Sequence, residues 1–179
     1  MIIIGITGSI GMGKTTIAHM LRQLSIPVFD SDIEVKDVLE NNDKAKSQIN
    51  KIWPNVFFKQ DKRKKIDKVA LSKIVFSNEK NREKLEKIIH PLVKERRDIF
   101  IKLSHNSHII ALDVPLLYET GTDKICDEVF LAYTNQIKQK KRVLARVNMT
   151  EEIFDFIKKA QWDTDKKKKK KPYLVTTTY

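Results

Sequence analysis

The stretch GITGSIGMGKTTIAHML, residues 5–21, contains four of the chain's five glycines within nine positions. Glycine lets a backbone turn tightly and approach another molecule closely, because it has no Cβ atom. An apolar, β-branched run, residues 2–6, precedes the glycines, and Ile17, Leu21 and Leu24 recur after them at helical spacing. The pattern predicts a strand, a glycine-rich loop that approaches a ligand, and a helix.

Four residues of this loop, Gly8, Gly13, Lys14 and Thr15, match the spacing G-x-x-x-x-G-K-[ST] between a predicted strand and a predicted helix. In such a loop the backbone amides and the helix N-terminus bind phosphates. Lys14 is expected to neutralise the β- and γ-phosphates, and the Thr15 hydroxyl to bind Mg²⁺. The predicted ligand is a nucleoside triphosphate; a glycine-rich turn with a chance lysine is the alternative.

The rest of the chain argues against a GTPase. Such proteins normally carry D-x-x-G and N-K-x-D, but no N-K-x-D occurs, and the one later glycine, Gly121, has Tyr118 three places before it. The additional Gly11, which gives G-x-G-K-T-T, and the compact length indicate a kinase for small molecules.

Length and composition set limits on the protein. With 179 residues, 41% of them hydrophobic, the chain is expected to form one soluble domain with a small insertion. No apolar run approaches the roughly 18–20 residues that span a bilayer, and MIII is too short for a secretory signal, so we expect a cytoplasmic protein. The single cysteine, Cys126, excludes an intrachain disulfide and a cysteine-based metal cluster, and is expected to be buried.

The net charge of +12 is unevenly distributed. Residues 166–171 are six consecutive lysines, so the rest of the chain carries 12 − 6, or +6. We expect this lysine run to belong partly to a tail. A moderately basic body suits either nucleic acid or substrates with several phosphates, and charge alone does not choose between them.

Short apolar strands are expected to alternate with helices, which is typical of a three-layer α/β fold with a parallel sheet. Residues 41–67 have no sustained period and are interpreted as part of a helical insertion, and Pro91 is expected to kink or split the helix that contains it. Thr150 is expected to cap the last predicted helix. The further strands are expected at 26–30, 108–113 and 128–133, and the helices at 31–40, 66–76, 78–103, 135–147 and 151–161.

Acidic residues follow two of the predicted strands. Asp30 and Asp32 end the second strand at a spacing that points both to one side, and ligands gather at the carboxyl ends of parallel strands. Either could orient the proton of an attacking hydroxyl, or simply cap the next helix. Asp113 in IIALDVPLLYE is a candidate second acid near the metal ion, or a turn residue.

Basic residues complete the set of candidates. Arg142 and Arg146 in QKKRVLAR are four apart, so they are expected on one helical face. They could stabilise the charge on a transferred phosphoryl group, or be ordinary solvated side chains. His90 in IIHPLV could contact the acceptor, or be a capping or core histidine.

Several separated motifs together resemble the dephospho-CoA kinase family. The resemblance covers residues 2 to about 161, and DSD after the second strand, HPL and DVPLLYE in this order make it specific. The motifs are GITGSIGMGKTTIA, PVFDSDIEVKDVL, IIHPLVKE, LDVPLLYETG and QKKRVLAR, with MTEE and Gln161 beyond.

This resemblance implies a P-loop kinase fold with five parallel strands, a helical acceptor-binding insertion and a small lid. Residues 1–30 and 104–179 would form the nucleotide-binding core, with the lid near 138–150, and residues 31–103 the insertion. It also implies that ATP, with Mg²⁺, phosphorylates the ribose 3′-hydroxyl of dephospho-CoA, and we expect a monomer that binds neither nucleic acid nor membranes.

The expected site residues combine the candidates given above with roles that the resemblance implies for residues 11–16, Asp32, Arg142 and Arg146. Asp32 is expected to be the acid-base residue, Arg142 and Arg146 belong to the lid region, and Lys14 acts with them in catalysis. Acceptor contacts are expected from Asp32, His90 and Asp113. The expected ATP-binding residues are Gly8, Gly11, Met12, Gly13, Lys14, Thr15 and Thr16.

The C-terminal stretch departs from the family pattern. Where the family has an Ala-Asp pair, an apolar strand, an asparagine and a closing helix, this chain reads KKPYLVTTTY after the lysine run. YLV is a candidate fifth strand.

Two other functions stay open: a nucleoside or nucleotide kinase of the same fold, and a nucleic-acid-binding ATPase that uses the lysine run.

Overall fold

A computed structural model describes residues 1–58, 65–147 and 149–178. The chain forms two compact units. The first, here called the sheet unit, combines Met1–Ser31 with Phe100–Tyr179, and the second, the helical unit, is Asp32–Ile99.

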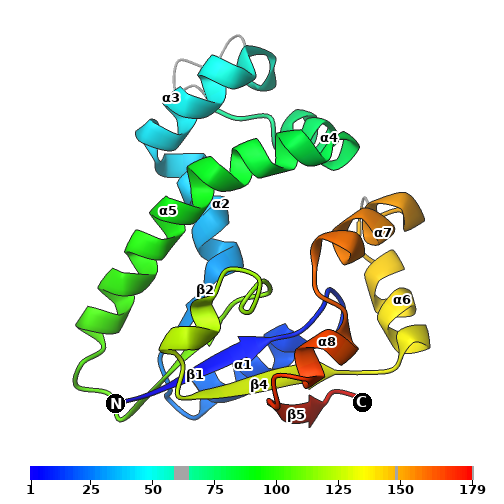
Figure 1. Ribbon diagram of the computed structural model, residues 1–179. Coiled ribbons are helices and arrows are strands. Elements are labelled where there is room, and N and C mark those ends of the chain that lie inside the picture. Colours follow the sequence, from blue (N-terminus) through cyan, green and yellow to red (C-terminus); the bar gives the residue numbers. More distant parts are fainter. Residues whose placement is uncertain (59–64, 148, 179) are drawn as a thin grey trace. The chain divides into compact units, whose positions relative to one another are not determined.

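A five-stranded sheet with all neighbours parallel forms the centre of the sheet unit (Figure 1). The strand order is β2-β3-β1-β4-β5, so β1 lies in the middle. The predicted α/β fold with five parallel strands is confirmed, including the YLV strand. The strands are β1 (Ile2–Thr7), β2 (Val28–Asp30), β3 (Ile109–Asp113), β4 (Glu128–Tyr133) and β5 (Tyr173–Thr176).

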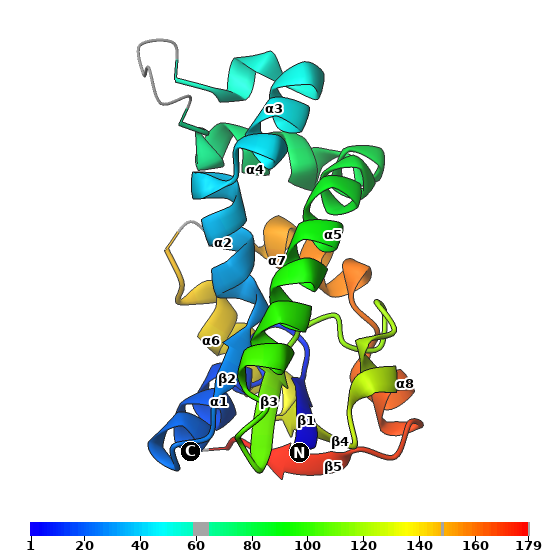
Figure 2. The same ribbon diagram turned by 90° about the vertical axis from the view of Figure 1, so that its left-hand side faces the viewer.

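Helices cover both faces of this sheet. Helix α1 (Lys14–Gln23) and helix α8 (Thr164–Lys168) lie on opposite sides of it (Figure 2). The inward face of α1 is apolar at helical spacing, and Ile17, Ala18 and Leu21 are buried. They pack with Ile4 and Ile6 of β1 in one apolar cluster. Burying each large aliphatic side chain contributes about 1.5–3 kcal/mol, and this fixes α1, and the loop before it, on the sheet.

Three other helices of the sheet unit begin at a side-chain cap. Asn135 caps α6 (Gln136–Leu144), Thr150 caps α7 (Glu151–Ala160) as predicted, and Asp163 caps α8. A short 3₁₀ turn, η2 (Thr122–Ile125), follows β3. Two expectations were wrong: α6 ends at Leu144 rather than 147, and the lysine run contains a helix where a tail was expected.

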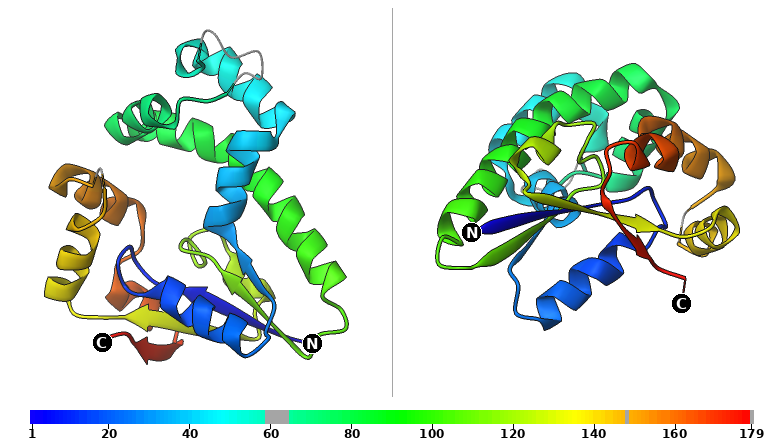
Figure 3. Two further views of the ribbon diagram at one scale, coloured as in Figure 1. Left: turned by 180° about the vertical axis from the view of Figure 1, so that it is seen from behind. Right: turned by 60° about the horizontal axis from the view of Figure 1, so that its bottom comes forward.

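The helical unit has its own core. It contains most of α2 (Ser31–Asn41), α3 (Asp43–Ile52), the 3₁₀ turn η1 (Pro54–Val56), α4 (Lys68–Ser77) and most of α5 (Glu79–Leu103). Helix α5 contains Pro91 and is not split, but it changes direction along its length (Figure 3). The buried core residues are Val38, Ala45, Ile49, Val56, Ile66, Leu71, Val75, Ile88 and Ile89.

Helix α3 lies in the segment 41–67, for which the sequence predicted an insertion but no separate helix. Asn42 accepts a hydrogen bond from the Ala45 amide and so caps α3. Only Ala45 and Ile49 of this helix are fully buried, which is too few positions to establish a period. Residues 59–64 of this segment, residue 148 of the expected lid and residue 179 lie outside the described residues. In the described part of the chain, no helix is both long and apolar enough to cross a bilayer.

Candidate active site

The phosphate loop, residues 8–15, joins β1 to α1 at the carboxyl edge of the sheet. Gly11 and Gly13 have φ values of 77° and 88°, in the left-handed region that favours glycine. A Cβ atom on Gly11 would lie 2.5 Å from Val143 Cγ2, and one on Gly13 would lie 2.4 Å from Thr177 Oγ1. Both glycines are therefore required by the packing of the loop as well as by its backbone conformation.

Side chains from distant parts of the chain hold this loop. Gln139 Nε2 of α6 donates to the Ile10 carbonyl at 2.8 Å, and the Ile10 amide donates to Gln161 Oε1 at 2.9 Å. The Met12 carbonyl accepts a 2.6 Å hydrogen bond from Thr177 Oγ1, just after β5. Gln139 and Thr177 are buried. These contacts fix the backbone of the loop at Ile10 and Met12, and so they fix its curvature.

Four other backbone amides of the phosphate loop are not used to hold its shape. Within residues 1–58, 65–147 and 149–178, no protein group accepts a hydrogen bond from the amides of Gly11, Gly13, Lys14 or Thr15. A helix N-terminus leaves such donors without internal partners, and a glycine loop adds further ones. This arrangement can bind the oxygens of a phosphate chain.

Lys14 and Asp113 form an ion pair at the same edge of the sheet. Lys14 Nζ lies 2.8 Å from Asp113 Oδ1, and their side chains are 12% and 2% exposed. Asp113 is the last residue of β3, opposite Ile6 of β1, and its carbonyl accepts a 3.0 Å hydrogen bond from Ser31 Oγ. A carboxylate therefore stands beside the loop lysine, close to where Lys14 would meet phosphates.

Of the two candidate arginines, only Arg142 is held beside the phosphate loop. Its Nη2 donates to the Thr177 carbonyl at 2.7 Å and its Nη1 to Thr177 Oγ1 at 3.3 Å. Arg146 is exposed and lies beyond the end of α6, so the expectation that both arginines share one helical face was wrong. Thr177 was not among the predicted site residues, because nothing in the sequence indicates a contact across 165 positions.

The remaining acidic and histidine candidates are divided between the two units. Asp30 Oδ2 lies 3.6 Å from Arg22 Nη2 of α1. Asp32 is exposed in the first turn of α2, directly after Ser31, and His90 is exposed on α5. Asp32 and His90 belong to the helical unit, and their roles stay predictions.

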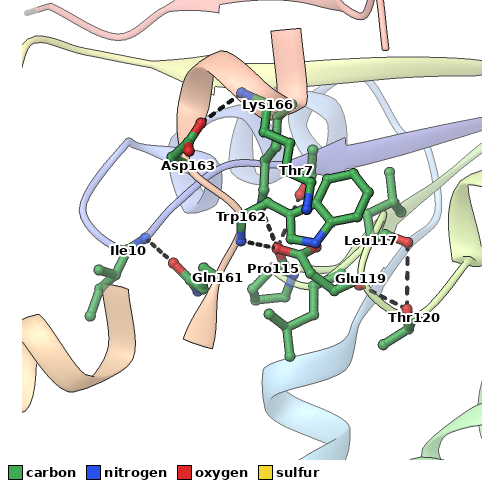
Figure 4. Close-up of polar contacts among 12 residues, drawn as sticks. Thr7, Ile10, Pro115, Leu117, Glu119, Thr120, Gln161, Trp162, Asp163 and Lys166 are labelled. Atoms are coloured by element: carbon green, nitrogen blue, oxygen red, sulfur yellow. Dashed lines mark hydrogen bonds and ion pairs between the residues drawn. The ribbon is translucent and has the colours of Figure 1, made fainter. Parts of the chain in front are cut away.

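The C-terminal part of the chain packs against the segment 114–120 that follows β3 (Figure 4). The rings of Trp162 and Tyr118 stack with centroids 6.1 Å apart, and Lys166 Nζ lies 3.8 Å from the Trp162 ring centroid. Burial raises the pKa of the Tyr118 phenol to about 12. Lys167 is fully buried, so the expectation that the lysine run is a tail was wrong at this position.

Residues that could bind a metal ion are few. Among the described residues, no group of three or more His, Cys, Asp or Glu side chains is arranged to hold one. The Thr15 hydroxyl and the Asp113 carboxylate supply oxygen donors next to the phosphate loop, and Mg²⁺ prefers such ligands.

The single cysteine, Cys126, is half-buried, whereas a buried side chain was expected. Its Sγ atom lies 2.9 Å from the position that a Cβ atom on Gly5 would take.

Comparisons with known proteins identify a family that this chain resembles along most of its length. The family model described as Dephospho-CoA kinase matches residues 2–177, which extends the resemblance beyond residue 161. The dephospho-CoA kinase of Bartonella henselae is 37% identical over 177 residues, covering 98% of this chain and 88% of that protein. That of Jannaschia sp. is 33% identical over 175 residues, with the same shares covered.

Solved structures show the same fold. The crystal structure of TT1252 from Thermus thermophilus matches with a TM-score of 0.81 and 30% identity, covering 99% of this chain and 89% of that one. The dephospho-CoA kinase from Campylobacter jejuni matches with a TM-score of 0.69 and 24% identity, covering 99% and 88%. From the family match along nearly the whole chain and these relatives, we conclude that the chain belongs to the dephospho-CoA kinase family.

Proposed function

We propose that this protein transfers the γ-phosphoryl group of ATP to the ribose 3′-hydroxyl of dephospho-CoA, giving coenzyme A and ADP. Membership of the family supports the choice of substrates. The observation that carries the proposal is the phosphate loop, with the Lys14 ammonium at one edge. Its amides at Gly11, Gly13, Lys14 and Thr15 donate to no group among the described residues. We expect the enzyme to act as a monomer in the cytoplasm, where ATP is supplied, without nucleic acid or membranes as partners.

The loop and Lys14 would bind the phosphates of ATP. As ATP binds, the Lys14 ammonium exchanges its 2.8 Å contact with Asp113 for the β- and γ-phosphate oxygens. The amides add hydrogen bonds that are already oriented before the reaction, which is the least costly way to stabilise charge that develops in a transition state. Gly8, Met12 and Thr16 belong to the same loop and helix start and complete the proposed ATP site.

Phosphoryl transfer then needs an acceptor oxygen and neutralised charge. Asp32 is proposed to take the proton of the ribose 3′-hydroxyl while that oxygen forms a bond to the γ-phosphorus and the bond to the ADP oxygen breaks. Arg142, and Arg146 if the segment after α6 moves, would stabilise the negative charge on the equatorial oxygens. Residues 138–150 are thus the proposed lid.

Mg²⁺ is proposed to accompany the nucleotide. Thr15 would hold it through the side-chain hydroxyl, with the Asp113 carboxylate nearby. The ion would supply positive charge that offsets the negative charge of the phosphates.

The helical unit is proposed to receive the acceptor, with Asp32 and His90 among the contacts. Asp113, a residue of the sheet unit, is proposed as a further acceptor contact. A panel of acceptors tests the proposal: the purified protein, ATP and Mg²⁺ are incubated with dephospho-CoA, adenosine, deoxyadenosine or AMP, and the products are weighed. We expect a phosphorylated product from dephospho-CoA alone. A product from a nucleoside, with dephospho-CoA unchanged, would favour the nucleoside kinase instead.

A further inference from the structure

Lys167 differs from every other lysine of the run 166–171. Its side chain is 0% exposed, whereas residues 169–171 are exposed. Burial lowers the pKa of the Lys167 ammonium, and the Glu119 carboxylate opposes that shift. A buried ammonium is unfavourable unless it is paired and hydrogen-bonded, so its contacts indicate what it does.

Among the described residues, the Lys167 ammonium makes two polar contacts, and both are with the segment 114–120 that follows β3. Lys167 Nζ donates to the Pro115 carbonyl at 3.0 Å and lies 3.2 Å from Glu119 Oε1. The Pro115 carbonyl also accepts a 3.1 Å hydrogen bond from Thr7 Oγ1, at the end of β1. Lys167 therefore links α8 to the chain beside the start of the phosphate loop.

Glu119 extends this link to the connection between α7 and α8. Its Oε1 accepts a 2.7 Å hydrogen bond from the Trp162 amide (Figure 4). Glu119 makes this bond in addition to the contact with Lys167. Its Oε2 is buried and has no hydrogen-bond partner in the part of the chain that the structure describes. The one positive charge within 4 Å of the Glu119 carboxylate, among those described residues, is Lys167. Without it, we expect Glu119 to turn toward water and release the Trp162 amide.

The residue before Trp162 contacts the phosphate loop directly. Gln161 Oε1 accepts the 2.9 Å hydrogen bond from the Ile10 amide (Figure 4). Two adjacent residues of the α7–α8 connection thus make one hydrogen bond to Glu119 and one to the loop. The hydrogen bond that holds the Trp162 backbone therefore also positions the adjacent Gln161. The Gln161 side chain in turn holds the Ile10 amide.

We propose that Lys167 is a positioning residue for the phosphate loop, which it holds through Glu119, the Trp162 backbone and Gln161. It contacts no reacting atom; its role is to keep the loop amides in the arrangement that phosphates require. The inference rests on the proposed function for its effect on ATP, but not for its effect on the Ile10 amide. If Lys167 only stabilised the fold, replacing it would change neither ATP affinity nor hydrogen exchange at the Ile10 amide.

The test compares Lys167→Met with Lys170→Met, which removes the same charge from an exposed position of the same run. Hydrogen exchange at the Ile10 amide is followed by NMR, and ATP affinity by calorimetry. We expect Lys167→Met to speed exchange at Ile10 and to weaken ATP binding about fivefold to tenfold, as expected when one hydrogen bond is lost. Lys170→Met should stay within about twofold of the wild type.

A double variant separates positioning from folding. Glu119→Leu with Lys167→Met removes both buried charges, and replacing a buried ion pair by apolar side chains is often neutral for stability. We expect it to fold as stably as the wild type and still to bind ATP weakly, with fast exchange at Ile10. Wild-type exchange and ATP affinity in this double variant, or in Lys167→Met, would overturn the proposal. If the wild type neither bound ATP nor made coenzyme A, the proposed function would fail, whereas exchange at Ile10 would still decide the role of Lys167.

Discussion

The substitution Gly13→Ala tests the packing of the phosphate loop against the end of the chain. At φ 88° an L-residue costs about 1–2 kcal/mol. The new Cβ would also lie 2.4 Å from Thr177 Oγ1 and 2.7 Å from Thr177 Cβ, so Thr177 has to move. That movement breaks the 2.6 Å hydrogen bond to the Met12 carbonyl, at about 1–3 kcal/mol for a buried acceptor left unpaired. We expect Gly13→Ala to lower the free energy of unfolding by about 2–5 kcal/mol.

Two matched variants separate the backbone contribution from the clash. Gly121 also has a positive φ, 69°, but a Cβ there would meet only Lys124 Cε at 4.0 Å, so Gly121→Ala should cost about 1–2 kcal/mol. In a Thr177→Gly background, where the obstructing side chain is absent, Gly13→Ala should likewise cost about 1–2 kcal/mol.

The assay is urea unfolding with m-values compared across the variants, together with ATP affinity by calorimetry. We expect Gly13→Ala to weaken ATP binding at least about tenfold, because the displaced loop no longer presents its amides together. If Gly13→Ala cost the same free energy in the wild-type and Thr177→Gly backgrounds, Thr177 would not pack against position 13 and the reasoning would be refuted.

Three further predictions concern single side chains. Lys14→Ala should lower turnover by about 10²–10³, because the transferred phosphates lose their cation; near-normal steady-state kinetics would contradict that role. Asp32→Asn should abolish most turnover and leave ATP affinity within about twofold, and full activity would make Asp32 a helix-terminus residue only. The Tyr118 phenol should ionise near pH 12 in the folded protein, so stability that is intact below pH 10 is lost as pH rises from 10 to 12. In an ultraviolet titration at low temperature, the difference between wild type and Tyr118→Phe should have its midpoint near 12, and a midpoint near 10 in folded protein would disprove burial of this phenol.

Local patterns predicted much of the sheet unit. The apolar strands, the glycine spacing and the cap at Thr150 each depend on residues close in sequence, and these signals do not need the tertiary structure. The strand YLV could be recognised for the same reason, although the lysines before it resembled a solvated tail. Helix α3 was not resolved, because only Ala45 and Ile49 of it are fully buried.

The contacts that shape the candidate site could not be predicted in this way. Thr177 reaches Met12 across 165 positions, and Gln161 reaches Ile10 across 151. Lys167 looks the same as its five lysine neighbours in the sequence, and only the position of Glu119 in the folded chain distinguishes it. Arg146 was wrongly predicted to share a helical face with Arg142. The prediction assumed helical spacing beyond Leu144, where α6 ends.

The most direct test of the central claim is to identify the product that the purified protein forms from ATP and dephospho-CoA. We predict coenzyme A, with the new phosphate on the ribose 3′-oxygen as located by phosphorus NMR, and one ADP released for each phosphate transferred. ATP hydrolysis without transfer, or a phosphate attached at another position, would contradict the account.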